Sequence, residues 1–203
     1  MPGRRLIRLV WLAAAIACAA PATAAELIAG PARIATPTEN YDSGGFFSEL
    51  RLGALASVDG RERVREDGLF VDAQVLLNPI LPPLDSFILD LLLRPRPHAG
   101  ATISTAGETN QLYAGLTWTV PLGEVLFLEA SFGATLHDHA LDEDFENGAQ
   151  LGCHLLFRES AGIGLAIGAH WRLLASVDHA SHAGLCGAND GLTHAGTSVG
   201  YRF

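Results

Sequence analysis

The chain has 203 residues, enough for one domain, and its formal net charge is −9 because 22 acidic residues outnumber 13 basic ones, all of them arginine. This acidic balance argues against a nucleic-acid partner, since binding to phosphates requires excess positive charge. Apolar residues nevertheless make up 49% of the chain, and the mean hydropathy is positive at +0.25.

The first 24 residues are predicted to be a secretory signal peptide. They combine a basic start, an apolar run and the sequence Ala22-Thr23-Ala24, which fits an A-x-A cleavage site. Residues 25–45 are predicted to be an N-terminal extension, and residues 46–203 the folded domain. Signal peptides direct export, so the domain is expected outside the cytoplasm.

Beyond the signal peptide no apolar run reaches the roughly 18 residues that a transmembrane helix needs. The longest candidate, residues 84–93 (LDSFILDLLL), carries two aspartates and follows a pair of prolines. An apolar, exported chain without a spanning helix favours a transmembrane β-barrel, in which lipid-facing and lumen-facing residues alternate.

Alternation of this kind is clear in the middle of the chain. In residues 112–120 (LYAGLTWTV) the even positions are apolar, and the odd positions are mostly small or polar. After a tight turn at 121–123, residues 126–137 (LFLEASFGATLH) repeat the pattern. A period of two over ten or more residues indicates a strand. Strands this long are more typical of a membrane barrel than of a soluble sandwich.

The mature chain is predicted to be all-β, an eight-stranded antiparallel transmembrane β-barrel of the bacterial outer membrane. The predicted strands are 47–58, 68–77, 93–104, 110–121, 124–138, 148–158, 162–178 and 192–203. Tight turns at 121–123 and 159–161 are predicted at the periplasmic end, and longer polar loops at the outer end. The proline-rich segment 78–92 leaves a short periplasmic helix open. Side chains fill a barrel of this size, so a wide pore is not expected.

His179 and Ser181 interrupt the apolar stripe at the end of the seventh predicted strand. The odd positions of residues 163–177 are apolar and predicted to face lipid, and His179 and Ser181 continue that parity. Polar groups turned toward lipid cost free energy, which points to a function. Because a neighbouring imidazole can activate a serine hydroxyl, the pair predicts an ester hydrolase acting on a lipid.

The motif around this pair resembles that of a known family. His179-Ala180-Ser181-His182-Ala183, followed by Asn189-Asp190-Gly191, is similar to the motif of the outer-membrane lipid A deacylases (lipid A 3-O-deacylase, acyloxyacyl hydrolase-like). The stretches RPRPHAGATIS, NQLYAGLTWTVPL and LGCHLLFRES also look similar, so the resemblance covers roughly residues 47–203. It implies an eight-stranded barrel that removes an ester-linked (3-O) acyl chain from lipid A, the anchor of lipopolysaccharide, without a cofactor.

Carried over to this chain, the resemblance makes Ser181 the nucleophile and His179 the general base. The oxyanion hole of the family uses an asparagine and the following alanine, and here these positions are His182 and Ala183. A histidine can still donate a hydrogen bond through a ring N–H.

The acid of the family's triad lies fourteen residues after the histidine, at a position that is Thr193 here. A threonine can accept a hydrogen bond from imidazole, but it cannot stabilise the positive charge as a carboxylate does. Asp190, in the same loop, is the predicted substitute, whereas Asp178 faces the lumen by parity. Loss of the acid can cost a serine triad several orders of magnitude in rate.

Two other functions stay open at this stage. A non-catalytic barrel that binds lipid or supports the envelope is the main alternative, because the acid is missing. Clustered imidazoles can bind zinc or copper, but the spacing is a weak signal and no metal is predicted. The histidines concerned are His137, His139, His179, His182 and His194.

The mature chain contains two cysteines, Cys153 and Cys186. The periplasm and the cell surface permit disulfides, and a bridge would hold the loop after the motif beside the candidate catalytic residues. The sequence leaves this bridge open, because Cys153 is predicted to lie within strand six. A homodimer is also left open.

Overall fold

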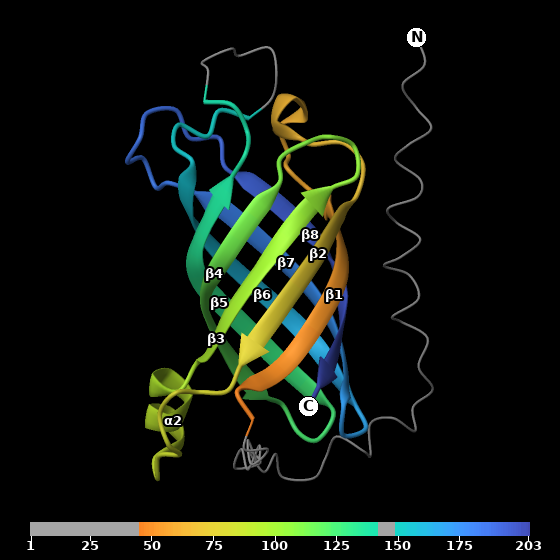
Figure 1. Cartoon of the computed structure of the whole chain (residues 1–203), viewed down its shortest axis with the longest axis vertical. Helices are drawn as coiled ribbons and strands as arrows, with labels where there is room; N and C mark the ends of the chain where they lie inside the picture. The colour runs from red at the N-terminus through yellow and green to blue at the C-terminus, as the bar shows by residue number, and fades with distance from the viewer. Residues whose placement is uncertain (1–44, 142–148) are drawn as a thin grey trace, which may run out of the picture. The chain divides into compact units, whose positions relative to one another are not determined.

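The computed structural model describes residues 45–141 and 149–203. Eight strands form a closed barrel in which each strand pairs with the next and the last pairs with the first (Figure 1). All eight pairings are antiparallel, so the predicted fold class is confirmed. The strands are β1 (Phe47–Ser57), β2 (Phe70–Leu77), β3 (Arg96–Ser104), β4 (Gln111–Pro121), β5 (Leu126–His137), β6 (Leu155–Ile167), β7 (Trp171–Ser181) and β8 (Leu192–Arg202). The predicted signal peptide lies outside the described residues.

Two short helices accompany the sheet. The 3-10 helix η3 (Glu62–Val64) lies between β1 and β2, and α2 (Phe87–Leu93) lies between β2 and β3. The hydroxyl of Ser86 caps α2 by accepting a hydrogen bond from the N–H of Leu89. Helix α2 confirms the short helix that the proline-rich segment left open.

The two ends of the barrel differ in their connections (Figure 1). Helix α2 and the turns after β4 and β6 lie at one end, and four longer loops lie at the other. In outer-membrane barrels the short turns face the periplasm, so we call the other end of this barrel its outer end. Across residues 45–141 and 149–203, no helix combines the length and apolar character needed to cross a membrane.

The predicted boundary between strands six and seven is wrong. Strand β6 runs without a break from Leu155 to Ile167, through the predicted turn at 159–161, and does not begin at 148. The turn comes at 168–170, where Gly168 has a φ of 64°. Residues 160–162 (SAG) resemble a turn because they are small, but they pair with β7 in an unbroken ladder. Because the true turn holds three residues, odd positions face outward on both sides of it.

The interior is filled by buried charged side chains at the level of the periplasmic half of the strands. Arg96 donates to Glu49 at 2.8 Å and to Glu129 at 3.0 Å. Arg51 forms ion pairs with the same two carboxylates. Each buried charge therefore has a partner of opposite sign, which offsets the cost of removing it from water.

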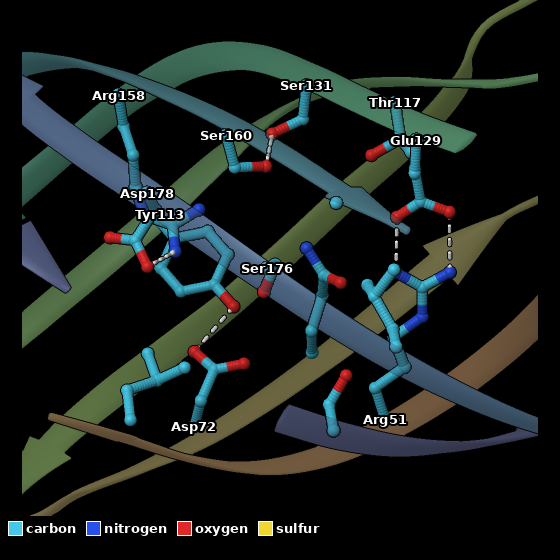
Figure 2. A pocket seen from close by; sticks show the side chains of 15 residues that line it. Arg51, Asp72, Tyr113, Thr117, Glu129, Ser131, Arg158, Ser160, Ser176 and Asp178 are labelled. Atoms are coloured by element: carbon cyan, nitrogen blue, oxygen red, sulfur yellow. Dashed lines mark hydrogen bonds and ion pairs between the residues drawn. The ribbon is translucent and has the colours of Figure 1, made fainter. Parts of the chain in front are cut away.

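A second group of buried polar residues lies nearer the outer end. The Tyr113 hydroxyl donates to Asp72 at 2.8 Å, and Arg158 forms an ion pair with Asp178 at 3.3 Å. A cavity of about 40 Å³ borders both groups (Figure 2). So small a space agrees with the expected filled interior and leaves no room for a lipid inside the barrel.

Candidate functional site on the outer wall

Polar side chains gather at one place on the outward-facing surface. Alternation along the strands turns one residue in two toward lipid, and most of these residues are apolar. Four exceptions lie side by side near the outer end, and we call them the outward polar cluster: Glu159 on β6, His179 and Ser181 on β7, and Thr193 on β8. Glu159 is the only charged residue, and His179 the only histidine, at an outward position of the eight strands.

The register fixes the neighbours of His179. It pairs directly with Glu159 on one side and with Thr193 on the other. Its Nδ1 lies 3.0 Å from the Thr193 hydroxyl oxygen. When Nδ1 donates this hydrogen bond, Nε2 carries the lone pair that a general base needs.

The imidazole of His179 also packs over Gly191, the residue just before β8. A Cβ atom at Gly191 would lie 2.7 Å from Cε1 of His179, closer than non-bonded carbon atoms approach. Gly191 also has a φ of 70°, which favours glycine. The ring thus rests against bare main chain on one side and a hydroxyl on the other.

Ser181 is the last residue of β7, two positions after His179 on the same outward parity. Both side chains are half-buried. Within the described part of the chain, no hydrogen bond joins the Ser181 hydroxyl to the imidazole. Catalytic hydrogen bonds are often loose without substrate and tighten in the complex.

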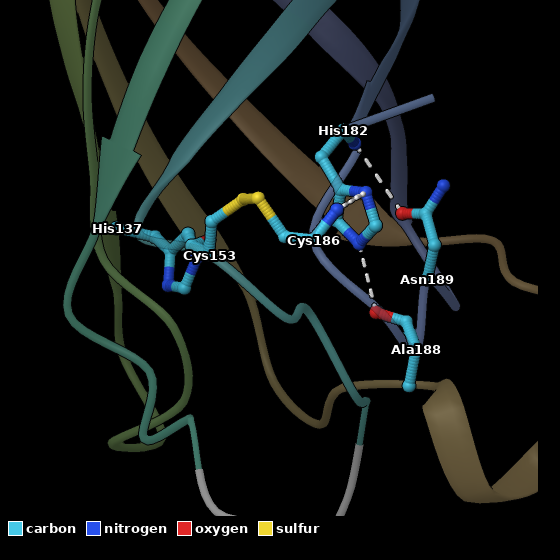
Figure 3. The surroundings of a disulfide bond; sticks show 6 residues. All are labelled: His137, Cys153, His182, Cys186, Ala188 and Asn189. Carbon is cyan, nitrogen blue, oxygen red and sulfur yellow. Dashed lines mark hydrogen bonds between the residues drawn. A yellow bond between two sulfur atoms is a disulfide. The ribbon is translucent and has the colours of Figure 1, made fainter. Parts of the chain in front are cut away.

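The loop after Ser181 holds the predicted oxyanion-hole residues. Nε2 of His182 donates to the carbonyl of Ala188 at 2.8 Å, and Nδ1 accepts from the N–H of Cys186 at 3.2 Å (Figure 3). Both ring nitrogens are therefore occupied inside the loop, and the ring is buried. The role of the His182 ring stays a prediction, and this arrangement leaves main-chain groups as the nearer donors.

Ala183 offers such a main-chain group. It has a φ of 52°, and no other non-glycine residue among those described has a positive φ. Its N–H has no acceptor in the described part of the chain. Backbone conformations of this kind cost free energy and cluster at functional sites. Ala183 is thus a candidate oxyanion donor through its backbone.

A disulfide between Cys153 and Cys186 joins this loop to the segment before β6 (Figure 3). The two Cα atoms are 5.7 Å apart, within the usual range. Cys153 precedes β6 and does not lie in a strand, contrary to the prediction, which explains how it reaches the loop. The bridge that the sequence left open is therefore present.

The histidines do not converge on one metal site. His179 faces outward, His182 is buried in its loop, and His194 faces the interior, where it contacts Glu66 at 2.9 Å. Within residues 45–141 and 149–203, the one group with metal-ligand character is Cys153, His182 and Cys186. Both of its sulfur atoms form the disulfide.

Asp190, the predicted substitute acid, links its own loop to the loops that contain Arg61 and Gln150. One carboxylate oxygen accepts from Arg61 at 2.6 Å, and the other accepts from the N–H of Gln150 at 3.0 Å. Its use as a catalytic acid stays a prediction. Asp178 faces the interior and is buried, as its parity predicts.

An apolar groove of about 250 Å³ borders the cluster on the β6 side. Phe157, one of its lining residues, pairs directly with Ser181. The disulfide and the loop after Ser181 form another wall. The lining residues are Ala134, Cys153, Leu155, Leu156, Phe157, His182, Leu185 and Cys186.

Sequence reasoning missed both the groove and Glu159. The groove is formed by three segments whose proximity depends on strand pairing and the disulfide. Glu159 fell within the predicted turn at 159–161 and so had no assigned face. Its odd position, shared with Ile163 and Leu165, would have indicated that Glu159 faces outward if the strand had been predicted to continue to Ile167.

These features define a small outer-membrane barrel with a polar cluster on its lipid-facing wall. Residues 100–202 match the model of the family described as lipid A 3-O-deacylase (PagL). The chain therefore belongs to the lipid A 3-O-deacylase family and is a protein of the outer membrane. The predicted resemblance and location are confirmed, whereas the comparisons give no support for a homodimer.

One solved structure has a similar fold. The crystal structure of the outer membrane enzyme PagL superposes with a TM-score of 0.58 at 17% identity, covering 75% of this chain and 98% of that one. The N-terminal β-barrel domain of Pseudomonas aeruginosa OprF gives 0.47 at 13% identity, covering 78% and 100%. A designed transmembrane β-barrel gives 0.46 at 10% identity, covering 77% and 95%. A comparison with curated proteins gives no match. At these identities the likeness concerns the fold alone.

Proposed function

We propose that this protein is a serine-dependent esterase that removes a 3-O-linked acyl chain from lipid A in the outer membrane. The observation that carries the proposal is the outward pair His179 and Ser181 at the outer end of a barrel of this family. A reactive pair on the outer wall can meet a substrate that stays embedded in the membrane.

The chemistry needs only side chains and main chain. The Ser181 hydroxyl oxygen attacks the ester carbonyl carbon while Nε2 of His179 accepts the hydroxyl proton. The carbonyl oxygen gains negative charge, which the N–H of Ala183 stabilises by donating a hydrogen bond. The bond from the carbonyl carbon to the sugar oxygen then breaks, and the imidazolium protonates that oxygen to give the free sugar hydroxyl, leaving the acyl chain on Ser181. Water, deprotonated by His179, releases the fatty acid and restores the serine.

The apolar groove supports a lipid substrate. One of its lining residues, Phe157, is the cross-strand partner of Ser181. The lining consists almost wholly of apolar side chains and the disulfide. An acyl chain in this groove would bring its ester toward Ser181 without leaving an apolar environment, which limits the cost of binding.

Mass spectrometry of lipid A from cells that express the protein tests the proposal. Wild-type protein should remove one hydroxyacyl chain, and Ser181→Ala should leave lipid A intact. A heat-dependent shift in gel mobility would show that both barrels are folded. Intact lipid A with folded wild-type protein would refute the proposal and favour a non-catalytic barrel, with Thr193 at the family's acid position as the physical reason.

A further inference from the structure

We propose that Glu159 and Thr193 divide between them the work of the missing triad acid. Thr193 orients His179, and Glu159 supplies the negative charge that stabilises the imidazolium. The inference rests on the proposed function, and it assigns to Glu159 an electrostatic role, exerted on His179, that the sequence motif does not contain.

The acid of a serine triad has two separable tasks. It holds the imidazole in the right tautomer and orientation, and it stabilises the positive charge that forms on the ring. Thr193 performs the first, because its hydroxyl oxygen lies 3.0 Å from Nδ1. A neutral hydroxyl cannot perform the second, so the site lacks a charge on the β8 side.

The barrel supplies this charge from the opposite side. Glu159 on β6 is the direct cross-strand partner of His179. Side chains paired in this way have Cβ atoms about 5 Å apart, which is within reach of a glutamate side chain. One carboxylate and one imidazole occupy outward positions of the eight strands, and the register places them next to each other.

The surroundings of Glu159 argue against a purely structural role. Its outward neighbours are apolar, with Phe132 paired to it on β5 and Phe157 two positions before it on β6. Within the described residues its carboxylate makes no ion pair or hydrogen bond. A lone carboxylate on a lipid-facing wall costs free energy, and a transient positive charge on His179 would offset that cost.

The carboxylates in the loops near His179 already accept hydrogen bonds from other groups. Asp59 accepts the main-chain N–H of Thr193 at 3.0 Å and the Ser57 hydroxyl at 3.2 Å. Asp190, next to Gly191, is bound by Arg61 and by Gln150. On β8 the neighbour is the uncharged Thr193, so Glu159 is the one charged strand partner of the imidazole.

The test measures kcat, KM and the pH–rate profile of purified protein on lipid A in detergent micelles. Glu159→Gln keeps the shape of the side chain and removes its charge. It should lower kcat by ~10- to 100-fold, a part of the loss seen when a triad loses its whole acid, with KM little changed. The acid limb of the profile should move to lower pH, because an imidazole without the carboxylate binds its proton less tightly.

A second variant tests rescue. Thr193→Glu in the Glu159→Gln background places a carboxylate on the β8 side, and it should restore kcat and return the acid limb toward its original pH. Thr193→Val alone should lower kcat without moving the limb to lower pH, because it removes the orienting hydroxyl and leaves the charge.

The outcomes separate this inference from the proposed function. A folded wild-type barrel with no deacylase activity refutes the proposed function itself. Active wild-type protein with an unchanged Glu159→Gln profile refutes the role of Glu159 alone and leaves Asp190 as the acid. A loss of rate in Glu159→Gln without movement of the acid limb would show a structural role, and would also overturn the inference.

Discussion

Substitution of Gly191 by alanine should disable the site through a single methyl group. The new Cβ would lie 2.7 Å from Cε1 and 3.1 Å from Nε2 of His179. Non-bonded carbon atoms prefer about 3.5 to 4.0 Å, so the imidazole must move by about 1 Å. A displacement of this size in a catalytic group can lower the rate on the order of 100-fold. The measurement is the initial rate of fatty-acid release from lipid A in micelles.

Gly187 provides a matched control in the same loop. Its φ is 96°, against 70° for Gly191, but a Cβ there would meet nothing within 4 Å. Both substitutions place alanine in a left-handed conformation, at a cost of roughly 1 to 2 kcal/mol. Gly187→Ala should therefore share the backbone strain of Gly191→Ala and keep most of the activity. Equal rates for the two variants would refute the claim that His179 depends on bare main chain at Gly191.

Two further perturbations probe the supports of the site. Replacement of both Cys153 and Cys186 by serine should raise the rate of hydrogen exchange at residues 182–188 and lower the deacylation rate. The reason is that a bridge spanning 33 residues of sequence no longer restrains the loop. Unchanged exchange would show that other contacts are enough to hold the loop in place. Glu129→Gln should destabilise the barrel by about 3 kcal/mol, because it leaves Arg51 and Arg96 short of buried negative charge. Urea unfolding in detergent measures this loss, and Glu124→Gln in the turn before β5 is a control that should leave the midpoint unchanged.

Alternation of apolar and polar residues was enough to predict the barrel. Strands β4 and β5 show it over almost their whole length, and Pro121 at the end of β4 and Gly123 in the turn mark the point where the chain reverses. The same reasoning failed between β6 and β7. There the small residues 160–162 (SAG) lie inside a strand, and the true turn is the equally short segment 168–170 (GAH).

That error had a larger effect on the site than on the fold. The outward direction of His179 and Ser181 depends only on parity, which a three-residue turn preserves. The partner of His179 depends on the register, and the position of the turn sets the register. A turn at 159–161 would place His179 opposite Leu141, whereas the observed turn places it opposite Glu159. No local pattern in the sequence carries this long-range information.

The disulfide links completion of the site to secretion of the chain. Thiols are kept reduced in the cytoplasm and are oxidised in the periplasm. The bond between Cys153 and Cys186 adds a covalent restraint on the segment that follows Ser181. The loop beside the proposed nucleophile Ser181 therefore lacks this restraint while the chain is in the cytoplasm, and gains it in the compartment that borders the outer membrane.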